Sequence, residues 1–165
     1  MQLTHYNTTF KKKSHPIVLV CDHISNAPNI GSLFRTADAF GIEKIIFIGG
    51  PIPNGRKMTK TSRSTEKVVP YEIRENIEET VQILKSSGYE IISLEITDNS
   101  RPLSSSTFHK QPLALIVGDE NFGVSKEGLK LSDSVIHIDM FGQNSSMNVV
   151  QATSIALYEI TKQLM

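Results

Sequence analysis

Residues Leu113–Gly123, with the sequence LALIVGDENFG, decide the fold class of this chain, because an apolar run passes directly into glycines and polar side chains. All of Leu113–Val117 is apolar, which is typical of a β-strand buried on both faces of a sheet. Such strands belong to parallel sheets that are covered by helices. The segment therefore predicts a parallel sheet, with Gly118 and its neighbours at the carboxyl end of one strand.

Outside this segment, β-rich runs alternate with helical patterns along the chain. We expect further strands near Ile17–Cys21, Lys44–Ile48, Val68–Ile73, Glu90–Leu94 and Ser134–Ile138. A helix with Pro28 ahead of it and Gly41 closing it, a second from Asn76 to Gly88, and a third from about Ser146 to the C-terminus complete the pattern. The third helix should bury Val149, Ala152, Thr153, Ala156, Ile160 and Leu164. The fold class is therefore α/β, a parallel sheet flanked by helices.

Length and charge limit the organisation and the partners. The 165 residues suit one domain, 1–165, with residues 1–15 as a short N-terminal segment. Seventeen basic residues balance 17 acidic ones, so a nucleic-acid surface would need local clustering. The segment Gly49–Thr65 and the segment Thr97–Gln111 are rich in turn-forming residues, and we expect both to be loops.

Basic residues cluster in two places, and the larger cluster overlaps the first of these loops. Between Asn54 and Lys67 five basic residues stand against one acidic residue, Glu66, and a shorter basic run is Lys11–Lys13. The five are Arg56, Lys57, Lys60, Arg63 and Lys67. An RNA-binding surface and a solvated loop are both open interpretations of this cluster.

The cysteine and histidine content and the lack of long apolar runs bear on the cellular location and on metal binding. Cys21 is the sole cysteine and stands in an apolar run, so we expect a reducing compartment and no disulfide. The N-terminal residues lack a signal-peptide pattern, and no apolar run could span a bilayer, so we expect a cytoplasmic protein without a membrane partner. The five histidines lack metal-ligand spacing, so we expect no metal site.

Three polar segments follow or face the predicted strand ends, where parallel sheets bind ligands. They are Asn29–Ala37, Gly118–Gly123 and Met140–Asn148. Together they resemble the motifs of the SpoU/TrmH branch of the SPOUT methyltransferases, over about Pro16 to Leu164. The first fits N-x-G-x-x-x-R-x-A, the second G-x-E-x-x-G, and the third I-P-M-x-G followed by S-[LM]-N-V. Asp139 stands where the family usually has proline.

The resemblance implies a C-terminal half folded as a trefoil knot and a homodimer formed through the knot region. It implies S-adenosyl-L-methionine as the cofactor and the ribose 2′-hydroxyl of RNA as the methyl acceptor. The segment Lys60–Pro70 is closest to the tRNA guanosine members, so tRNA is favoured over rRNA, although the helical extensions of some tRNA-modifying members are missing here. By the same resemblance the cofactor-binding residues are Gly118, Glu120, Ile138, Met140, Ser146, Met147 and Asn148.

The resemblance further assigns catalytic roles, to Arg35, Asn29, Glu120, Ser146 and Asn148. Arg35 would accept the hydroxyl proton, yet an arginine is almost never deprotonated, its pKa being roughly 12 or higher. The alternative is that Arg35 holds an RNA phosphate and stabilises developing negative charge, while another group takes the proton. We expect Asn29 both to cap the first helix and to organise the site. For Ser146 a cap of the last helix is the alternative to a functional role, and the functional role is favoured because side chains at a helix start point toward a ligand at the strand end. RNA contacts are predicted for Arg35, Arg56, Lys60 and Arg63.

Two other enzyme classes lack their motifs. A dinucleotide-dependent oxidoreductase needs G-x-G-x-x-G after the first strand, and a serine hydrolase needs G-x-S-x-G, and neither pattern occurs. A non-catalytic RNA-binding module that keeps the knot is a further alternative, against which the intact motif residues argue.

Overall fold

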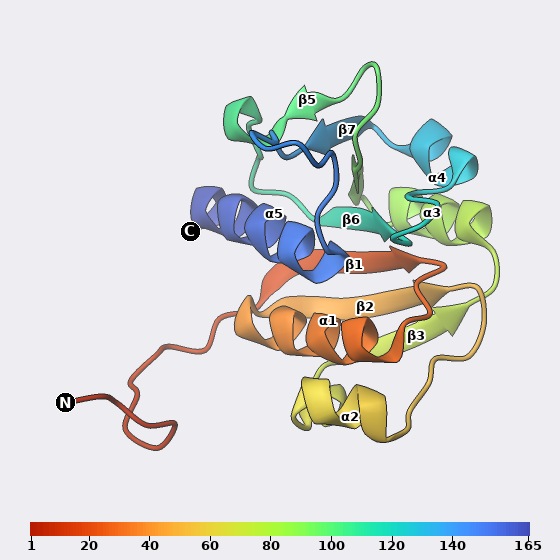
Figure 1. The fold of residues 1–165 in the computed structure, drawn as a ribbon. Coiled ribbons are helices and arrows are strands. Elements are labelled where there is room, and N and C mark those ends of the chain that lie inside the picture. The colour runs from red at the N-terminus through yellow and green to blue at the C-terminus, as the bar shows by residue number, and fades with distance from the viewer.

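The computed structural model describes residues 1–165 and shows a seven-stranded, fully parallel sheet with helices on both faces (Figure 1). The strand order is β3-β2-β1-β6-β4-β7-β5. The strands are β1 His15–Asp22, β2 Ile42–Ile48, β3 Tyr71–Arg74, β4 Glu90–Leu94, β5 Arg101–Pro102, β6 Leu113–Gly118 and β7 Ser134–His137. The prediction of an α/β fold with a parallel sheet is confirmed.

Two hydrophobic cores lie on opposite faces of the sheet, as the alternation of side chains along β1 shows. Ile17, Leu19 and Cys21 point into the larger core, whereas Val18 and Val20 point into the smaller one. Helices α1 (Ala27–Ala39) and α5 (Val149–Leu164) cover the larger core, and α3 (Ile77–Ser86) and α4 (Lys126–Leu131) cover the smaller one. None of the helices has the length and apolar character that crossing a bilayer requires.

The prediction of a loop over Gly49–Thr65 was wrong, because this segment contains helix α2 (Arg56–Ser62). This short helix packs against α1 at Gly31, where an added Cβ would lie 2.0 Å from Thr61 Oγ1. Isolated helices of this length are unstable in water, so tertiary contact, which the local sequence does not reveal, must hold it. Helix α4 was missed for the same reason.

Two further segments differ from the expectation. The strand predicted near Val68–Ile73 is present only in its second half, because β3 begins at Tyr71, after Pro70, and a 3₁₀ turn at Thr65–Lys67 precedes it. The loop predicted over Thr97–Gln111 contains β5 and a 3₁₀ turn at Leu103–Ser105. Both elements are too short to leave a periodic pattern in the sequence.

Asn26 and Asn148 cap the first and last helices, and neither Asn29 nor Ser146 does. Asn26, not Asn29, caps α1, and its Oδ1 accepts a hydrogen bond from the backbone N–H of Asn29 at 3.0 Å. Asn148, not Ser146, caps α5, and its Oδ1 accepts from the N–H groups of Val150 (2.8 Å) and Gln151 (3.4 Å). Each cap lies within three residues of the candidate that the sequence offered, and each is an asparagine, a residue type that caps well.

The start of the second helix and most of the buried face of the third were predicted correctly. Asn76 caps α3 through the N–H of Glu79, and the helix ends just before Gly88, whose φ is +87°. On α5 all the predicted residues except Ala152, which is half-buried, are buried, and Leu157 and Thr161 join them.

Candidate active site

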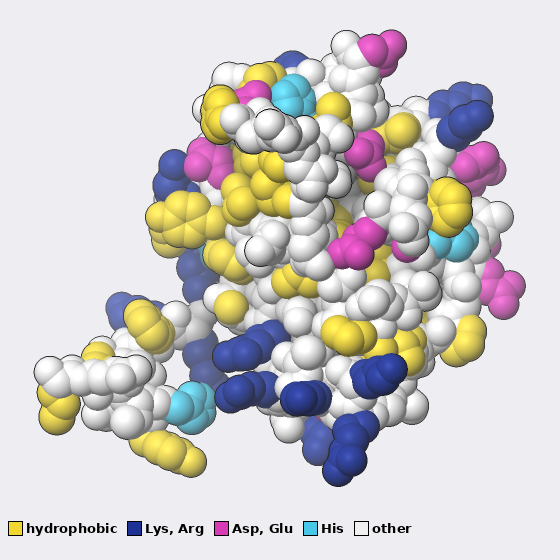
Figure 2. Space-filling view, in the orientation of Figure 1, with side chains coloured by type: hydrophobic (Ala, Val, Ile, Leu, Met, Phe, Trp, Pro, Cys, Tyr) yellow, Lys and Arg dark blue, Asp and Glu magenta, His cyan; other side chains and the backbone are white.

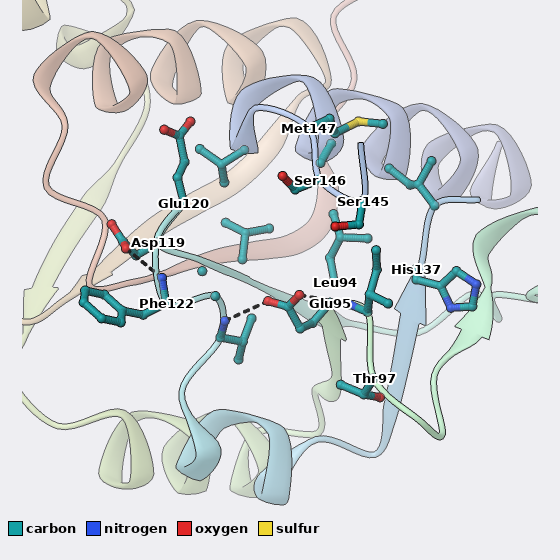
Figure 3. Close-up of a pocket in the computed structure, with 18 of the residues that line it drawn as sticks. Leu94, Glu95, Thr97, Asp119, Glu120, Phe122, His137, Ser145, Ser146 and Met147 are labelled. Atoms are coloured by element: carbon teal, nitrogen blue, oxygen red, sulfur yellow. Dashed lines mark hydrogen bonds between the residues drawn. The ribbon is translucent and has the colours of Figure 1, made fainter. Parts of the chain in front are cut away.

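A cavity of about 480 Å³ opens at the carboxyl ends of β4, β6 and β7 (Figure 3). The end of β4, the loop after β6 and the segment between β7 and α5 form its walls. These elements are neighbours because β4 lies between β6 and β7 in the sheet. A cavity of this size suits a small organic ligand, since such sites enclose roughly 300–1,000 Å³.

The loop after β6 folds back tightly on itself at one wall of the cavity. An added Cβ on Gly118 would lie 2.1 Å from the carbonyl carbon of Gly123, so no larger residue fits there. Asp119 Oδ1 accepts hydrogen bonds from the N–H groups of Asn121 (2.8 Å) and Phe122 (3.1 Å), and Gly123 N donates to the Asp119 carbonyl (2.7 Å). This turn therefore requires both glycines of the G-x-E-x-x-G motif, and it places Glu120 in the cavity wall.

A hydrogen-bond network joins the three motifs predicted from the sequence. Glu120 Oε1 accepts from Asn29 Nδ2 (3.0 Å) and from Asn148 Nδ2 (2.8 Å). Asn148 Nδ2 also donates to Asn29 Oδ1 (3.1 Å). Asn29 is 91 positions from Glu120 along the chain and 119 from Asn148. Residues from three distant segments therefore fix the position of one carboxylate.

Most of the predicted cofactor residues line the cavity. They are Gly118, Glu120, Ile138, Met140, Ser146 and Met147. Asn148 and Asn29 lie outside the lining and reach it through Glu120. Figure 3 shows Ser146 and Met147 on the segment before α5, across the cavity from Glu95.

The predicted RNA-binding residues lie away from the cavity. Arg35 is exposed on α1, makes no hydrogen bond or salt bridge, and is not among the lining residues. Arg56 and Lys60 are exposed on α2, and Arg63 is exposed at its C-terminal end. In Figure 2 the Lys and Arg side chains gather over α1 and α2, so the neutral chain has one distinctly basic side.

Sequence reasoning missed the contribution of β4 to the cavity. Glu95, Ile96 and Thr97, which follow β4, all line it. Glu95 Oε2 accepts from Val124 N and Oε1 accepts from Ile96 N, both at 3.0 Å. The polar residue directly after the predicted strand Glu90–Leu94 was an available signal. The position of β4 between β6 and β7 was not readable from the sequence.

Asp139, which departs from the motif that the third segment resembles, is held by side-chain contacts. Its Oδ1 lies 3.5 Å from His137 Nε2, and its Oδ2 accepts from Ser104 Oγ at 3.4 Å. His137 Nδ1 in turn lies 2.9 Å from Ser100 Oγ. These contacts connect the segment after β7 to the loop around β5, so side chains restrain the position of this segment.

The cavity is acidic and contains no Lys or Arg side chain. Its titratable lining residues are Glu95, Asp119, Glu120 and His137. No group of three or more His, Cys, Asp or Glu side chains is placed to hold a metal ion. Behind the cavity, burial raises the pKa of the Cys21 thiol well above its usual range, with a further contribution from the neighbouring Asp22. The site therefore offers carboxylates and backbone groups, and the buried Cys21 is not among its lining residues.

A parallel α/β sheet with a ligand-sized cavity beyond its strand ends and glycine-dependent turns in the cavity wall is the arrangement of a small-molecule-binding α/β enzyme. The particular family follows from comparison with known proteins. The chain belongs to the SpoU rRNA Methylase family, which it matches over residues 16–158. The prediction of the family is confirmed.

Relatives and solved structures agree with this assignment. A Borreliella burgdorferi protein named as an uncharacterized tRNA/rRNA methyltransferase is 31% identical over 157 residues, 94% of this chain and 68% of the relative. The tRNA (guanosine(18)-2′-O)-methyltransferase of Thermus thermophilus is 26% identical over 155 residues, 93% of this chain and 78% of the relative. The crystal structure of the Aquifex aeolicus TrmH/SpoU tRNA modifying enzyme aligns with a TM-score of 0.83 at 28% identity, over 92% of this chain and 77% of that one.

Proposed function

We propose that this chain is an S-adenosylmethionine-dependent methyltransferase that modifies a ribose 2′-hydroxyl of structured RNA, with tRNA favoured over rRNA. The observation that carries the proposal is the network that joins Asn29, Glu120 and Asn148 at the rim of a ligand-sized cavity. Membership of the SpoU family and relatives named as tRNA (guanosine(18)-2′-O)-methyltransferases support both the reaction and the preference for tRNA.

The cavity fits S-adenosylmethionine in its chemistry. Apolar side chains from all three walls, including Leu94, Ile138 and Met147, offer contact to a nucleoside base, and carboxylates offer partners for positive charge. When bound, the cofactor supplies a methyl group that is already activated on a positively charged sulfur. We assign its binding to Gly118, Glu120, Ile138, Met140, Ser146, Met147 and Asn148.

The network orients a carboxylate toward the substrate. Both amide donors converge on Oε1 of Glu120, so Oε2 remains free to accept a hydrogen bond from a ribose hydroxyl or from an arginine. Ser146 lies in the cavity wall, where its hydroxyl is available to the same substrate. Holding reacting groups in this way can supply several kcal/mol of the barrier reduction in a transfer reaction.

We propose that Arg35 acts in the cavity of a second subunit, within a homodimer formed through the C-terminal region. Its guanidinium has no partner in its own chain and lies outside its own cavity, which supports this role. The C-terminal region exposes large apolar side chains at Phe141 (96%), Ile155 (44%) and Tyr158 (62%), as a subunit interface requires. Arg35 then holds an RNA phosphate and stabilises charge that develops on the ribose oxygen.

The strand order supports the proposal of a trefoil knot within a single domain, 1–165. β7 is the last strand in the sequence, but it pairs with both β4 and β5, which precede β6 in the sequence. The chain from β7 to α5 must therefore pass beside the loop that joins β4, β5 and β6, and a threaded path accommodates this order. An RNA substrate together with a single buried cysteine fits a cytoplasmic location.

The Arg35→Ala variant tests whether Arg35 contacts RNA and not the cofactor. We expect it to abolish methylation while the calorimetric affinity for S-adenosylmethionine stays within a few-fold of wild type. The exposed Arg101 of β5 offers a control, and Arg101→Ala should retain activity. A large loss of cofactor affinity in Arg35→Ala would refute the assignment of Arg35 to RNA.

We propose that Arg56, Lys60 and Arg63 of the basic side contact RNA phosphates. Charge reversal at Arg56 and Arg63 should weaken RNA binding and flatten its dependence on salt, because each phosphate contact releases counterions. Reversal of Lys126 and Lys130, exposed on α4 on the opposite face of the sheet, is the matched control. An unchanged salt slope in the first variant would place the RNA elsewhere.

A further inference from the structure

Glu95 is a cavity residue that lies outside the three family motifs. It follows β4, and Figure 3 shows its carboxylate inside the cavity, between the loop that carries Phe122 and the strand that carries His137. The side chain is half-buried. Its location among the lining residues places it against any ligand that fills the cavity.

Both carboxylate oxygens of Glu95 accept hydrogen bonds from backbone N–H groups, but no salt bridge pairs the carboxylate with a cation. Oε2 accepts from Val124 N and Oε1 from Ile96 N, both neutral backbone donors at 3.0 Å. An added Cβ on Gly123 would lie 2.3 Å from Oε2, so the loop closes directly on the carboxylate. No Lys or Arg side chain lines the cavity, and no salt bridge involves Glu95. The cavity therefore holds a carboxylate that no Lys or Arg side chain pairs with and that a positively charged ligand group can approach.

We infer that Glu95 determines specificity for the charged methyl donor over the uncharged thioether product, an inference that rests on the proposed function. In the reaction the ribose oxygen bonds to the methyl carbon, and the carbon–sulfur bond breaks with its electron pair left on sulfur. The hydroxyl proton passes to the solvent or to a base. The sulfur enters with a positive charge and leaves neutral, so the attraction of Glu95 for it is lost at turnover.

This charge difference affects donor binding and product release more than the chemical step. A carboxylate that stabilises the sulfonium in the ground state stabilises a transition state of lower sulfur charge less strongly, so it does not accelerate the transfer. The Glu95→Gln variant should therefore raise the KM for S-adenosylmethionine about tenfold without lowering kcat. Competition by the product S-adenosylhomocysteine should become stronger relative to the donor.

Calorimetry with three ligands separates charge recognition from loop support. S-adenosylmethionine carries a sulfonium, sinefungin carries an amine that is protonated at neutral pH, and S-adenosylhomocysteine carries neither. In Glu95→Gln we expect the preference for each charged ligand over S-adenosylhomocysteine to fall about tenfold. Affinity for S-adenosylhomocysteine itself should stay within about threefold. Glu95→Asp, which keeps the charge, should keep the preference even where all three affinities fall.

Asp98→Asn provides the matched control, because it removes an equal charge three positions away, on an exposed residue outside the cavity lining. It should leave the preference unchanged. Equal weakening of all three ligands in Glu95→Gln would show that Glu95 supports the loop or pairs with the α-ammonium group that all three carry, and the inference would fail while the proposed function stands. Failure of the wild-type protein to bind any of the three would instead overturn the proposed function.

Discussion

Asn148 performs two separable tasks, and a pair of substitutions distinguishes them. Its Oδ1 caps α5 through Val150 N and Gln151 N, while its Nδ2 donates to Glu120 and Asn29. Replacing a capping asparagine with alanine costs about 1 kcal/mol, and serine caps about as well as asparagine. Asn148→Ala should therefore lower the melting temperature by about 2–4 °C, as expected for about 1 kcal/mol in a domain of this size. Asn148→Ser should restore most of that loss.

Activity should behave differently, because a serine hydroxyl offers no second donor to bridge Glu120 and Asn29. Glu120 is exposed, so losing these bonds should cost little stability, but a misplaced catalytic group can cost on the order of 100-fold in rate. We expect both Asn148 variants to transfer methyl groups from S-adenosylmethionine to RNA about 100-fold more slowly than wild type. Thermal melts and a radiolabelled-methyl assay measure the two effects. Full activity in Asn148→Ser would refute the role of the network.

Three other predictions follow from contacts and pKa values. In Gly31→Ala the added methyl would lie 2.0 Å from Thr61 Oγ1, so the variant should destabilise the protein by about 1–3 kcal/mol and weaken RNA binding by displacing α2. The control Gly55→Ala, where an added Cβ meets no atom within 4 Å, should have a melting temperature near that of wild type. Burial raises the pKa of the Cys21 thiol, so iodoacetamide should label it only after unfolding, and rapid labelling of the folded protein would contradict its placement. Burial also raises the pKa of Tyr89 to about 12. Its contribution to stability is complete below pH 10 and is lost as the pH rises toward 12, so denaturant titrations of Tyr89→Phe should show a shallower decline over that range than wild type.

The fold class was predictable because the parallel strands are buried on both faces and carry uninterrupted apolar residues. Leu113–Val117 is the clearest case, and all five residues are at most 1% exposed. The short elements were not predictable. Helix α2 depends on the absence of a side chain at Gly31, 25 positions before it begins, and local propensity contains no trace of that contact.

The candidate site was predicted in its parts but not in its arrangement. Glycine-flanked polar segments after strands marked Gly118 and Glu120, and resemblance to a family marked Asn29 and Asn148. The sequence did not show that one carboxylate oxygen accepts from both asparagines. Glu95 was missed because strand order, rather than sequence order, brings the end of β4 to the cavity. Long-range pairing of this kind depends on the whole fold, so local patterns cannot specify it.

The central claim is that this chain transfers a methyl group from S-adenosylmethionine to a ribose oxygen of RNA. Mass spectrometry of nucleosides tests it most directly, using RNA from cells that lack the gene, incubated with purified protein and isotopically labelled S-adenosylmethionine. We predict a labelled nucleoside with the methyl on the ribose 2′-oxygen, found in the tRNA fraction and absent with Arg35→Ala. Label found on a base, or no labelled nucleoside in either tRNA or rRNA, would contradict the claim.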